Sequence, residues 1–142
     1  MGELVGIPET AAKMLWVAVA LSLVVMYGFG SIRKAHRRLA ASRPNLTKQQ
    51  FIAEMRPDCS PEAAEFLWEK SLYYLEPGLA PHPDDDLIND LKIDDDDLGI
   101  DWPRDWAECR SFHESNFPAW PEDWPVTVRN FGRWLDMSPN LS

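Results

Sequence analysis

Cysteine is scarce in this 142-residue chain, and so is positive charge over most of its length. The two cysteines, Cys59 and Cys109, are too few for a disulfide framework, so we expect two free thiols in a reducing compartment. Residues 44–142 hold 8 Lys and Arg against 21 Asp and Glu, a formal charge of −13. So acidic a segment repels nucleic acid phosphates, which excludes DNA or RNA binding. The acidity either draws the segment to basic protein surfaces or cations, or only keeps it soluble.

Signatures of catalysis are also missing. The sequence has no glycine-rich phosphate loop, no nucleophile elbow and no Ser/Cys–His–Asp order. His82, His113 and the two cysteines are scattered, without the spacing of transition-metal ligands. Aspartates are plentiful enough for acid–base chemistry, but a catalytic carboxylate needs a pocket and a shifted pKa, whereas this acidic run has a solvated composition. The sequence therefore predicts a protein that is not an enzyme and holds no cofactor.

One long apolar run is present near the N-terminus. Met14–Gly30 reads MLWVAVALSLVVMYGFG and carries no charge over 17 residues, close to the lower limit for a membrane-spanning helix. Trp16 and Tyr27 lie near its two ends, where amphipathic rings favour the membrane interface. We therefore predict a retained single-pass anchor within residues 1–30.

The charges on either side of the run differ. Glu3 and Glu9 precede it, whereas residues 31–43 contain five Lys and Arg and no acid. Basic flanks favour the cytoplasmic side, so we expect an inner (cytoplasmic) membrane protein with its N-terminus outside and its C-terminal domain in the cytoplasm. The basic segment either only sets this topology or also holds anionic lipid head groups. Pro44 should end any helix that continues out of the membrane.

Residues 44–142 have the pattern of a small helical domain. Thr47 and Gln50 form a capping box before a helix from Lys48 to about Met55. Ser60 followed by Pro61 starts a second helix, with an apolar stripe that continues until Pro77. Two further starts are expected at Asp101, before a helix bearing Trp106, Cys109, His113 and Phe117, and at Thr127, before a helix to about Met137. No strand is convincing, so the predicted fold is all-α, with three to four helices after the anchor.

An acidic stretch, Asp84–Trp102, lies between these helices. It contains nine aspartates and a single base, Lys92. Six apolar residues are interspersed, which a solvated tail would not need: Leu87, Ile88, Leu91, Ile93, Leu98 and Ile100. We therefore expect an ordered loop leading into a helix, with the apolar side chains inward and the carboxylates outward.

The order of these elements from Ser60 to Met137 resembles the acyl carrier protein fold. It looks most like a bacterial family of short carrier-like proteins of unknown function, in which an Asp-Leu-x-x-x-x-Asp-Asp turn replaces the carriers' Asp-Ser-Leu. Two registers fit this turn, Asp90–Asp96 and Asp97–Trp102. The carrier serine, which bears phosphopantetheine, is replaced by Asp95 in the first register and by Trp102 in the second. The resemblance therefore implies a carrier-like domain without a prosthetic group, which keeps the carriers' acidic docking face.

A calcium loop is a competing interpretation of the same stretch. Asp94, Asp96 and Gly99 fall at positions one, three and six of an EF-hand loop. Position five is Leu98, which has no ligating side chain, and position twelve is Asp105 instead of glutamate. The match is broken, and only Asp94 and Asp96 remain as candidate metal ligands.

These observations favour a membrane-anchored, acidic protein-interaction module. Its partner is expected to be a basic protein surface or a membrane complex. The alternatives are a module that responds to divalent cations and an accessory subunit held in a membrane complex through its span. The residues expected to bind the partner are Asp94, Asp95, Asp96, Asp97, Asp101 and Trp102.

Overall fold

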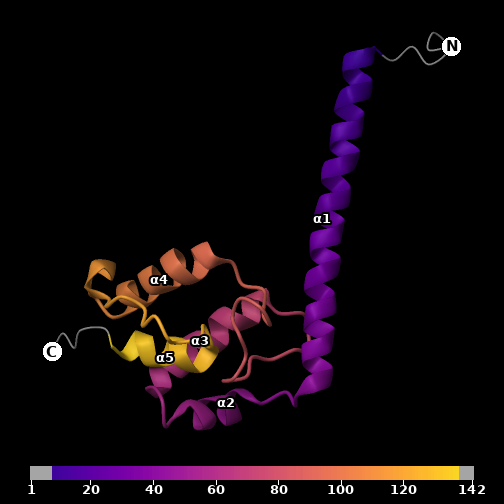
Figure 1. Cartoon of the computed structure of the whole chain (residues 1–142). Helices are drawn as coiled ribbons and strands as arrows, with labels where there is room; N and C mark the ends of the chain where they lie inside the picture. The colour runs from indigo at the N-terminus through magenta and orange to yellow at the C-terminus, as the bar shows by residue number, and fades with distance from the viewer. Residues whose placement is uncertain (1–7, 138–142) are drawn as a thin grey trace. The chain divides into compact units, whose positions relative to one another are not determined.

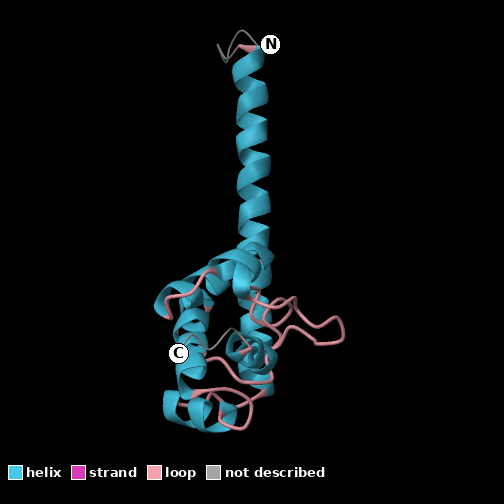
Figure 2. Cartoon of the chain, turned by 90° about the vertical axis from the view of Figure 1, so that its left-hand side faces the viewer, coloured by secondary structure: helices cyan, strands magenta, loops and turns pink. Residues whose placement is uncertain are grey.

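A computed structural model describes residues 8–137, so Glu3 lies outside the described residues. Within them the chain forms helices and loops (Figure 2). The one pairing of extended backbone within these residues is an isolated bridge between Asp86 and Thr127. The all-α prediction is thereby confirmed. The chain divides into two compact units between Lys34 and Ala35.

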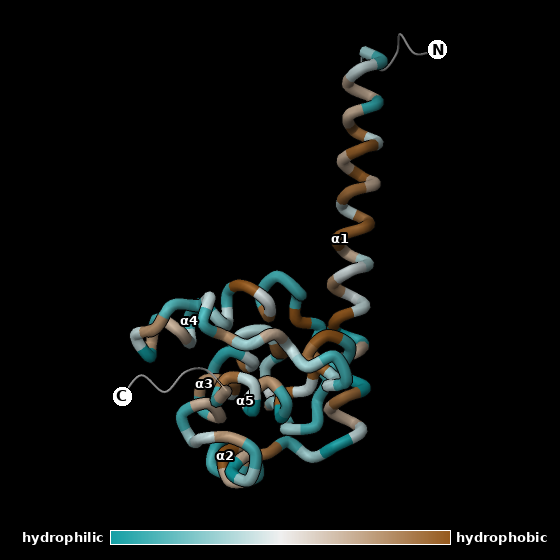
Figure 3. Tube along the Cα trace, turned by 60° about the vertical axis from the view of Figure 1, so that its left-hand side comes forward, coloured by the Kyte–Doolittle hydropathy of each residue, from teal (hydrophilic) through white to brown (hydrophobic). Residues whose placement is uncertain are grey.

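The first unit consists of most of helix α1, which runs from Glu9 to Ser42. An 18-residue window of α1 has a mean hydropathy of 2.0 and no buried residue, so by length and composition this helix can cross a membrane. Its apolar band is visible along the tube in Figure 3. Trp16 and Tyr27 are both exposed, at 74% and 81%. The helix ends two residues before Pro44, as predicted from the proline.

The second unit contains the four short helices α2 (Lys48–Met55), α3 (Pro61–Tyr74), α4 (Trp102–Cys109) and α5 (Val128–Asp136). Three predicted caps are confirmed. The hydroxyl of Thr47 accepts from Gln50 N and completes the capping box, Ser60 accepts from Ala63 N, and Thr127 accepts from Asn130 N. Each cap satisfies a backbone N–H that the first turn would otherwise leave unpaired.

Helix α3 lies at the centre of this unit and packs against α2 and α5 (Figure 1). The fully buried side chains include Phe51 and Met55 from α2, Leu67 from α3, and Val128 and Leu135 from α5. Large apolar side chains from separate helices thus form one core, which is how a domain of this size acquires its stability.

The second unit begins within α1, before the Pro44 boundary expected from the sequence. His36 is 2% exposed, and its Nε2 donates to the Leu91 carbonyl at 3.0 Å. Arg43 forms two 2.7 Å bonds from Nε and Nη2 to the carboxylate of Asp85. Residues 35–43 are therefore part of the helical domain, rather than only a basic segment beside the membrane.

The helix predicted to start at Asp101 starts earlier and ends earlier. Residues 95–109 are helical, with a π-helical turn, η2, at Asp97–Asp101. Asp101 has helical angles and caps nothing with its side chain, so its assignment as a cap was wrong. The helix stops at Cys109, and Ser111 has a φ of +60°, which an α-helix does not allow. His113 and Phe117 therefore do not lie on α4, and a short 3₁₀ turn, η3 (Glu114–Asn116), separates them.

Candidate functional site

The acidic stretch folds as a loop whose apolar side chains point inward, with one exception. Leu87, Leu91, Ile93 and Leu98 are buried, and Ile88 is half-buried. The loop is held by backbone bonds from Leu87 N to Val126 O at 2.9 Å and from Ile93 N to Leu87 O at 3.0 Å. Ile100, expected to point inward, is instead 54% exposed, because the π-helical turn rotates it away from the core.

One carboxylate of the stretch is buried, contrary to the expectation that all point outward. Asp85 is 2% exposed and receives Arg43 through both carboxylate oxygens. It also accepts from His82 N at 2.8 Å. Burial raises the pKa of Asp85, and the bonds from Arg43 oppose that rise. Asp85 is therefore structural and does not belong to a docking surface.

Four consecutive aspartates, Asp94–Asp97, form what we call the acidic turn. Asp94 Oδ1 accepts from Asp96 N at 2.8 Å, so Asp94 starts the helix that follows. Asp94, Asp95 and Asp96 are exposed. Asp97 is half-buried and accepts the Tyr74 hydroxyl at 2.7 Å. Burial and this bond raise the pKa of Tyr74 to about 12, which keeps the phenol protonated.

The acidic turn is distinguished by what its carboxylates lack. Six bases of the second unit pair with other acids, and the acids that they pair with are Asp58, Asp84, Asp85, Asp101, Asp105, Glu65 and Glu69. Asp86 and Asp90 accept backbone N–H groups of the loop. No Lys or Arg among the described residues forms an ion pair with Asp94, Asp95, Asp96 or Asp97. Their charge is left uncompensated at the surface, where it can attract a cationic partner.

The predicted set of partner-binding residues is divided by the structure. Asp94, Asp95 and Asp96 lie together at the surface, with Asp97 beside them. Asp101 lies one turn further along and pairs with Arg104 at 2.7 Å. Trp102 is 1% exposed and packs on Phe131, with ring centroids 5.5 Å apart. Its inclusion in the surface was wrong, because its ring belongs to the core.

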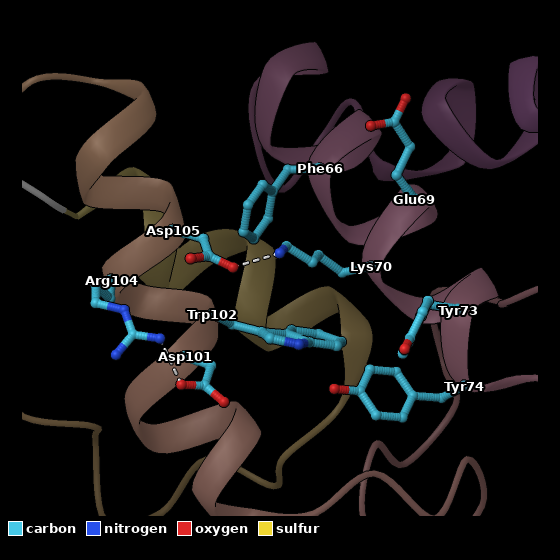
Figure 4. A pocket seen from close by; sticks show the side chains of 9 residues that line it. All are labelled: Phe66, Glu69, Lys70, Tyr73, Tyr74, Asp101, Trp102, Arg104 and Asp105. Carbon is cyan, nitrogen blue, oxygen red and sulfur yellow. Dashed lines mark hydrogen bonds and ion pairs between the residues drawn. The ribbon is translucent and has the colours of Figure 1, made fainter.

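An open pocket of about 570 Å³ is lined in part by Tyr74, whose hydroxyl donates to Asp97 of the acidic turn. Figure 4 shows it between α3 and α4, with Lys70 pointing to Asp105 and Arg104 to Asp101. Its lining includes Phe66, Tyr73, Tyr74 and the edge of Trp102. Tyr73 is 86% exposed, and its ring meets that of Tyr74 at 5.3 Å. Sequence reasoning missed Tyr73, although an aromatic residue outside the apolar stripe of α3 is the signal that could have found it.

The two residues that the carrier-like registers place at the serine position differ in their surroundings. Asp95 is the first helical residue after Asp94 and is exposed, whereas Trp102 lies inside the helical run 95–109 and is buried. The residue at the helix start, Asp95, has a carboxylate and no hydroxyl.

The described residues contain no group of three or more His, Cys, Asp and Glu side chains placed to hold a metal ion. Asp94 and Asp96, the candidate metal ligands, are both exposed. One carboxylate oxygen of Asp94 already accepts a hydrogen bond from the backbone N–H of Asp96. The position-twelve residue of the EF-hand match, Asp105, pairs with Lys70. These contacts give no support to a function that responds to divalent cations.

Comparisons with known proteins found no family model that matches the chain, and no match among curated proteins or solved structures.

Proposed function

We propose that this chain is a membrane-anchored protein-interaction module, whose acidic turn binds a basic surface of a partner protein. The observation that carries the proposal is the exposed trio Asp94, Asp95 and Asp96, with which no Lys or Arg of the described residues forms an ion pair. Charge complementarity of this kind steers association and selects the partner more than it adds affinity.

The proposal adds two exposed apolar side chains as anchors for the same partner, Tyr73, whose ring contacts that of Tyr74, and Ile100. Tyr73 is the most exposed of the large apolar side chains of the second unit, and Ile100 is exposed at 54% one turn after Asp97. Interfaces gain most of their affinity from a few such aromatic or aliphatic side chains surrounded by polar residues. A docking surface formed by the acidic turn, Tyr73 and Ile100 would combine both contributions.

The proposal includes the resemblance to an acyl carrier protein without a prosthetic group. It is supported by Asp95, which occupies the helix start where a carrier has its serine and offers no hydroxyl for a phosphodiester. The intact mass of the chain from its own cells should equal the sequence mass. An added phosphopantetheine mass would contradict this part of the proposal.

The proposal also includes the membrane topology. Helix α1 is apolar enough to span a membrane, and five bases with no acid follow its apolar run. Basic residues are retained on the cytoplasmic side. We therefore place α1 in the inner (cytoplasmic) membrane, with the N-terminus outside and the helical domain in the cytoplasm.

The docking function is tested by affinity capture of the full chain from solubilised membranes, with partners identified by mass spectrometry. The variant Asp94→Asn, Asp95→Asn, Asp96→Asn should lose a basic partner that the wild type retains. A matched control, Glu108→Gln, Glu122→Gln, Asp123→Asn, removes the same charge from exposed acids elsewhere in the domain and should retain it. Higher salt should weaken the wild-type capture.

Two outcomes would contradict the proposal. Equal capture by the two triple variants would show that the acidic turn is not the docking surface. If capture survives both variants but is lost when α1 is exchanged for an unrelated span, the chain is an accessory subunit held through its membrane helix.

A further inference from the structure

A second polar pocket, of about 310 Å³, lies within the second unit where the end of α1 meets the acidic loop. Its polar lining comes from Arg38 and Ser42 on α1 and from Asn89, Asp90 and Lys92 on the loop. The buried bond from His36 to the Leu91 carbonyl holds the loop against α1. This bond keeps Arg38 of α1 and Lys92 of the loop in the lining of one pocket.

Both bases of this pocket are unpaired. The side chain of neither Arg38 nor Lys92 forms an ion pair or a hydrogen bond among the described residues. This is unexpected in so acidic a domain, where both bases of α5, Arg129 and Arg133, pair with Asp58. Asp90 also lines the pocket, but its Oδ2 accepts from Asp86 N at 2.9 Å. The pocket is therefore lined by two unpaired bases and by one carboxylate, which already accepts a backbone hydrogen bond.

The backbone of Lys92 is strained at this point. Its φ is +59°, a left-handed conformation that favours glycine. Strain of this kind persists where the surrounding structure imposes it, and it gathers at binding sites. Lys92 is also the one base in the acidic stretch. A lysine thus stands where the backbone geometry would suit glycine better.

Asn89 adds a donor to the same wall. Its Nδ2 gives one N–H to Asp86 Oδ2 at 3.1 Å and has a second N–H to give. The guanidinium of Arg38, the ammonium of Lys92 and the amide of Asn89 are groups from which a phosphate accepts hydrogen bonds. A metal cation would be repelled, because Arg38 and Lys92 are both positive.

We propose that the pocket of Arg38, Asn89 and Lys92 binds a phosphate group, and that its source is the head group of an anionic phospholipid. We infer a lipid as the source of the phosphate from the position of the pocket in the sequence, because Arg38 comes eight residues after Gly30, the end of the predicted span. Clusters of bases at the cytoplasmic end of a span bind anionic lipids. This inference rests on the proposed insertion of α1, and it assigns a lipid contact to the helical domain itself.

The test uses the full chain in uncharged detergent micelles, titrated with phosphatidylglycerol, phosphatidylcholine or inorganic phosphate, with bound ligand counted by native mass spectrometry. Arg38→Gln and Lys92→Gly should each weaken phosphatidylglycerol binding by about tenfold, the loss of one charge-assisted contact. Asp90→Asn should strengthen it. Arg37→Gln is the matched control, because Arg37 is an exposed neighbouring base that does not line the pocket, and it should leave binding within about twofold.

Lys92→Gly is informative because it separates binding from folding. Glycine suits the φ of this position, so this variant should bind less lipid and yet melt at a higher temperature than the wild type. Inorganic phosphate that displaces the lipid with the same dependence on Arg38 and Lys92 would make free phosphate the source. Equal losses in Arg37→Gln and Arg38→Gln, or equal binding of phosphatidylcholine, would overturn the site.

A separate assay tests whether α1 inserts into a membrane. Flotation of the chain with phosphatidylcholine vesicles, which carry no net charge, reports insertion of α1 and does not require the pocket. A chain that does not float refutes the anchor, whereas a chain that floats but ignores phosphatidylglycerol refutes the pocket alone.

Discussion

Replacing Arg43 with alanine leaves Asp85 as a buried carboxylate without a base. The side chains of this pair are 11% and 2% exposed, and two 2.7 Å bonds join them. Removing one partner of a buried ion pair costs about 3–5 kcal/mol, because the other charge stays desolvated. That is a large part of the roughly 5–15 kcal/mol that stabilises a typical domain. In the double variant Arg43→Ala, Asp85→Asn the buried charge is gone, so it should be more stable than Arg43→Ala by about 2 kcal/mol.

The assay is urea unfolding of the full chain in micelles, followed by tryptophan fluorescence, since six of the seven tryptophans follow residue 44. The pH dependence gives a second check. Burial raises the pKa of Asp85 above its ordinary 3.8, so the folded chain binds this proton more readily than the unfolded chain. The contribution of Asp85 to stability therefore falls as pH rises through that raised pKa. Loss of Arg43 raises the pKa further, so the deficit of Arg43→Ala should shrink from pH 8 to pH 5.

The reasoning is refuted if Arg43→Ala costs less than about 1 kcal/mol, the range of an exposed pair. It is also refuted if the double variant is as unstable as the single one, because the loss would then come from packing and not from an unpaired charge.

Three further predictions follow from single contacts. Lys92→Gly should raise the free energy of unfolding by about 0.5–1 kcal/mol in urea titrations, because glycine relieves a φ of +59°, and an unchanged or lower value would show that no strain is present. Cys109 is exposed, whereas Cys59 is buried and burial raises the pKa of its thiol to about 12. A membrane-impermeant maleimide should therefore label only Cys109, and only after the cells are broken. Labelling in intact cells would contradict the proposed topology. Burial opposes ionisation of Asp58, but hydrogen bonds from Arg129 and Arg133 outweigh it and lower its pKa below 3.8. Asp58 should therefore add stability above about pH 4, and this stability is lost as pH falls through its lower folded pKa. In Asp58→Asn, the free energy of unfolding should fall less steeply as the pH is lowered through this range.

Local signals in the sequence were enough for the helices that have caps. Thr47, Ser60 and Thr127 each satisfy a backbone N–H three residues ahead, so their effect is contained in a short segment of chain. The apolar run of α1 is equally local, since spanning length and composition suffice to recognise it. For these reasons the all-α fold could be predicted.

The errors concern contacts between distant residues. Asp101 and Trp102 looked like a helix start at the surface, but the helix had already begun at Asp95, and its π-helical turn carries Trp102 onto Phe131 of α5. Burial of Asp85 depends on Arg43, 42 residues away, and no local pattern encodes that pairing. The trio in the acidic turn was found because charge density is visible in sequence, whereas its lack of internal partners is visible only in the fold.

Site-specific photo-crosslinking in cells tests the docking surface most directly. A photoreactive residue is placed at Asp95 in the acidic turn, and in a parallel strain at Asp123, an exposed acid outside it. We predict a crosslinked adduct from position 95, joined to a peptide rich in Lys and Arg, and none from position 123. An adduct from position 123 alone, or an adduct at position 95 joined to an acidic or apolar peptide, would contradict the docking function.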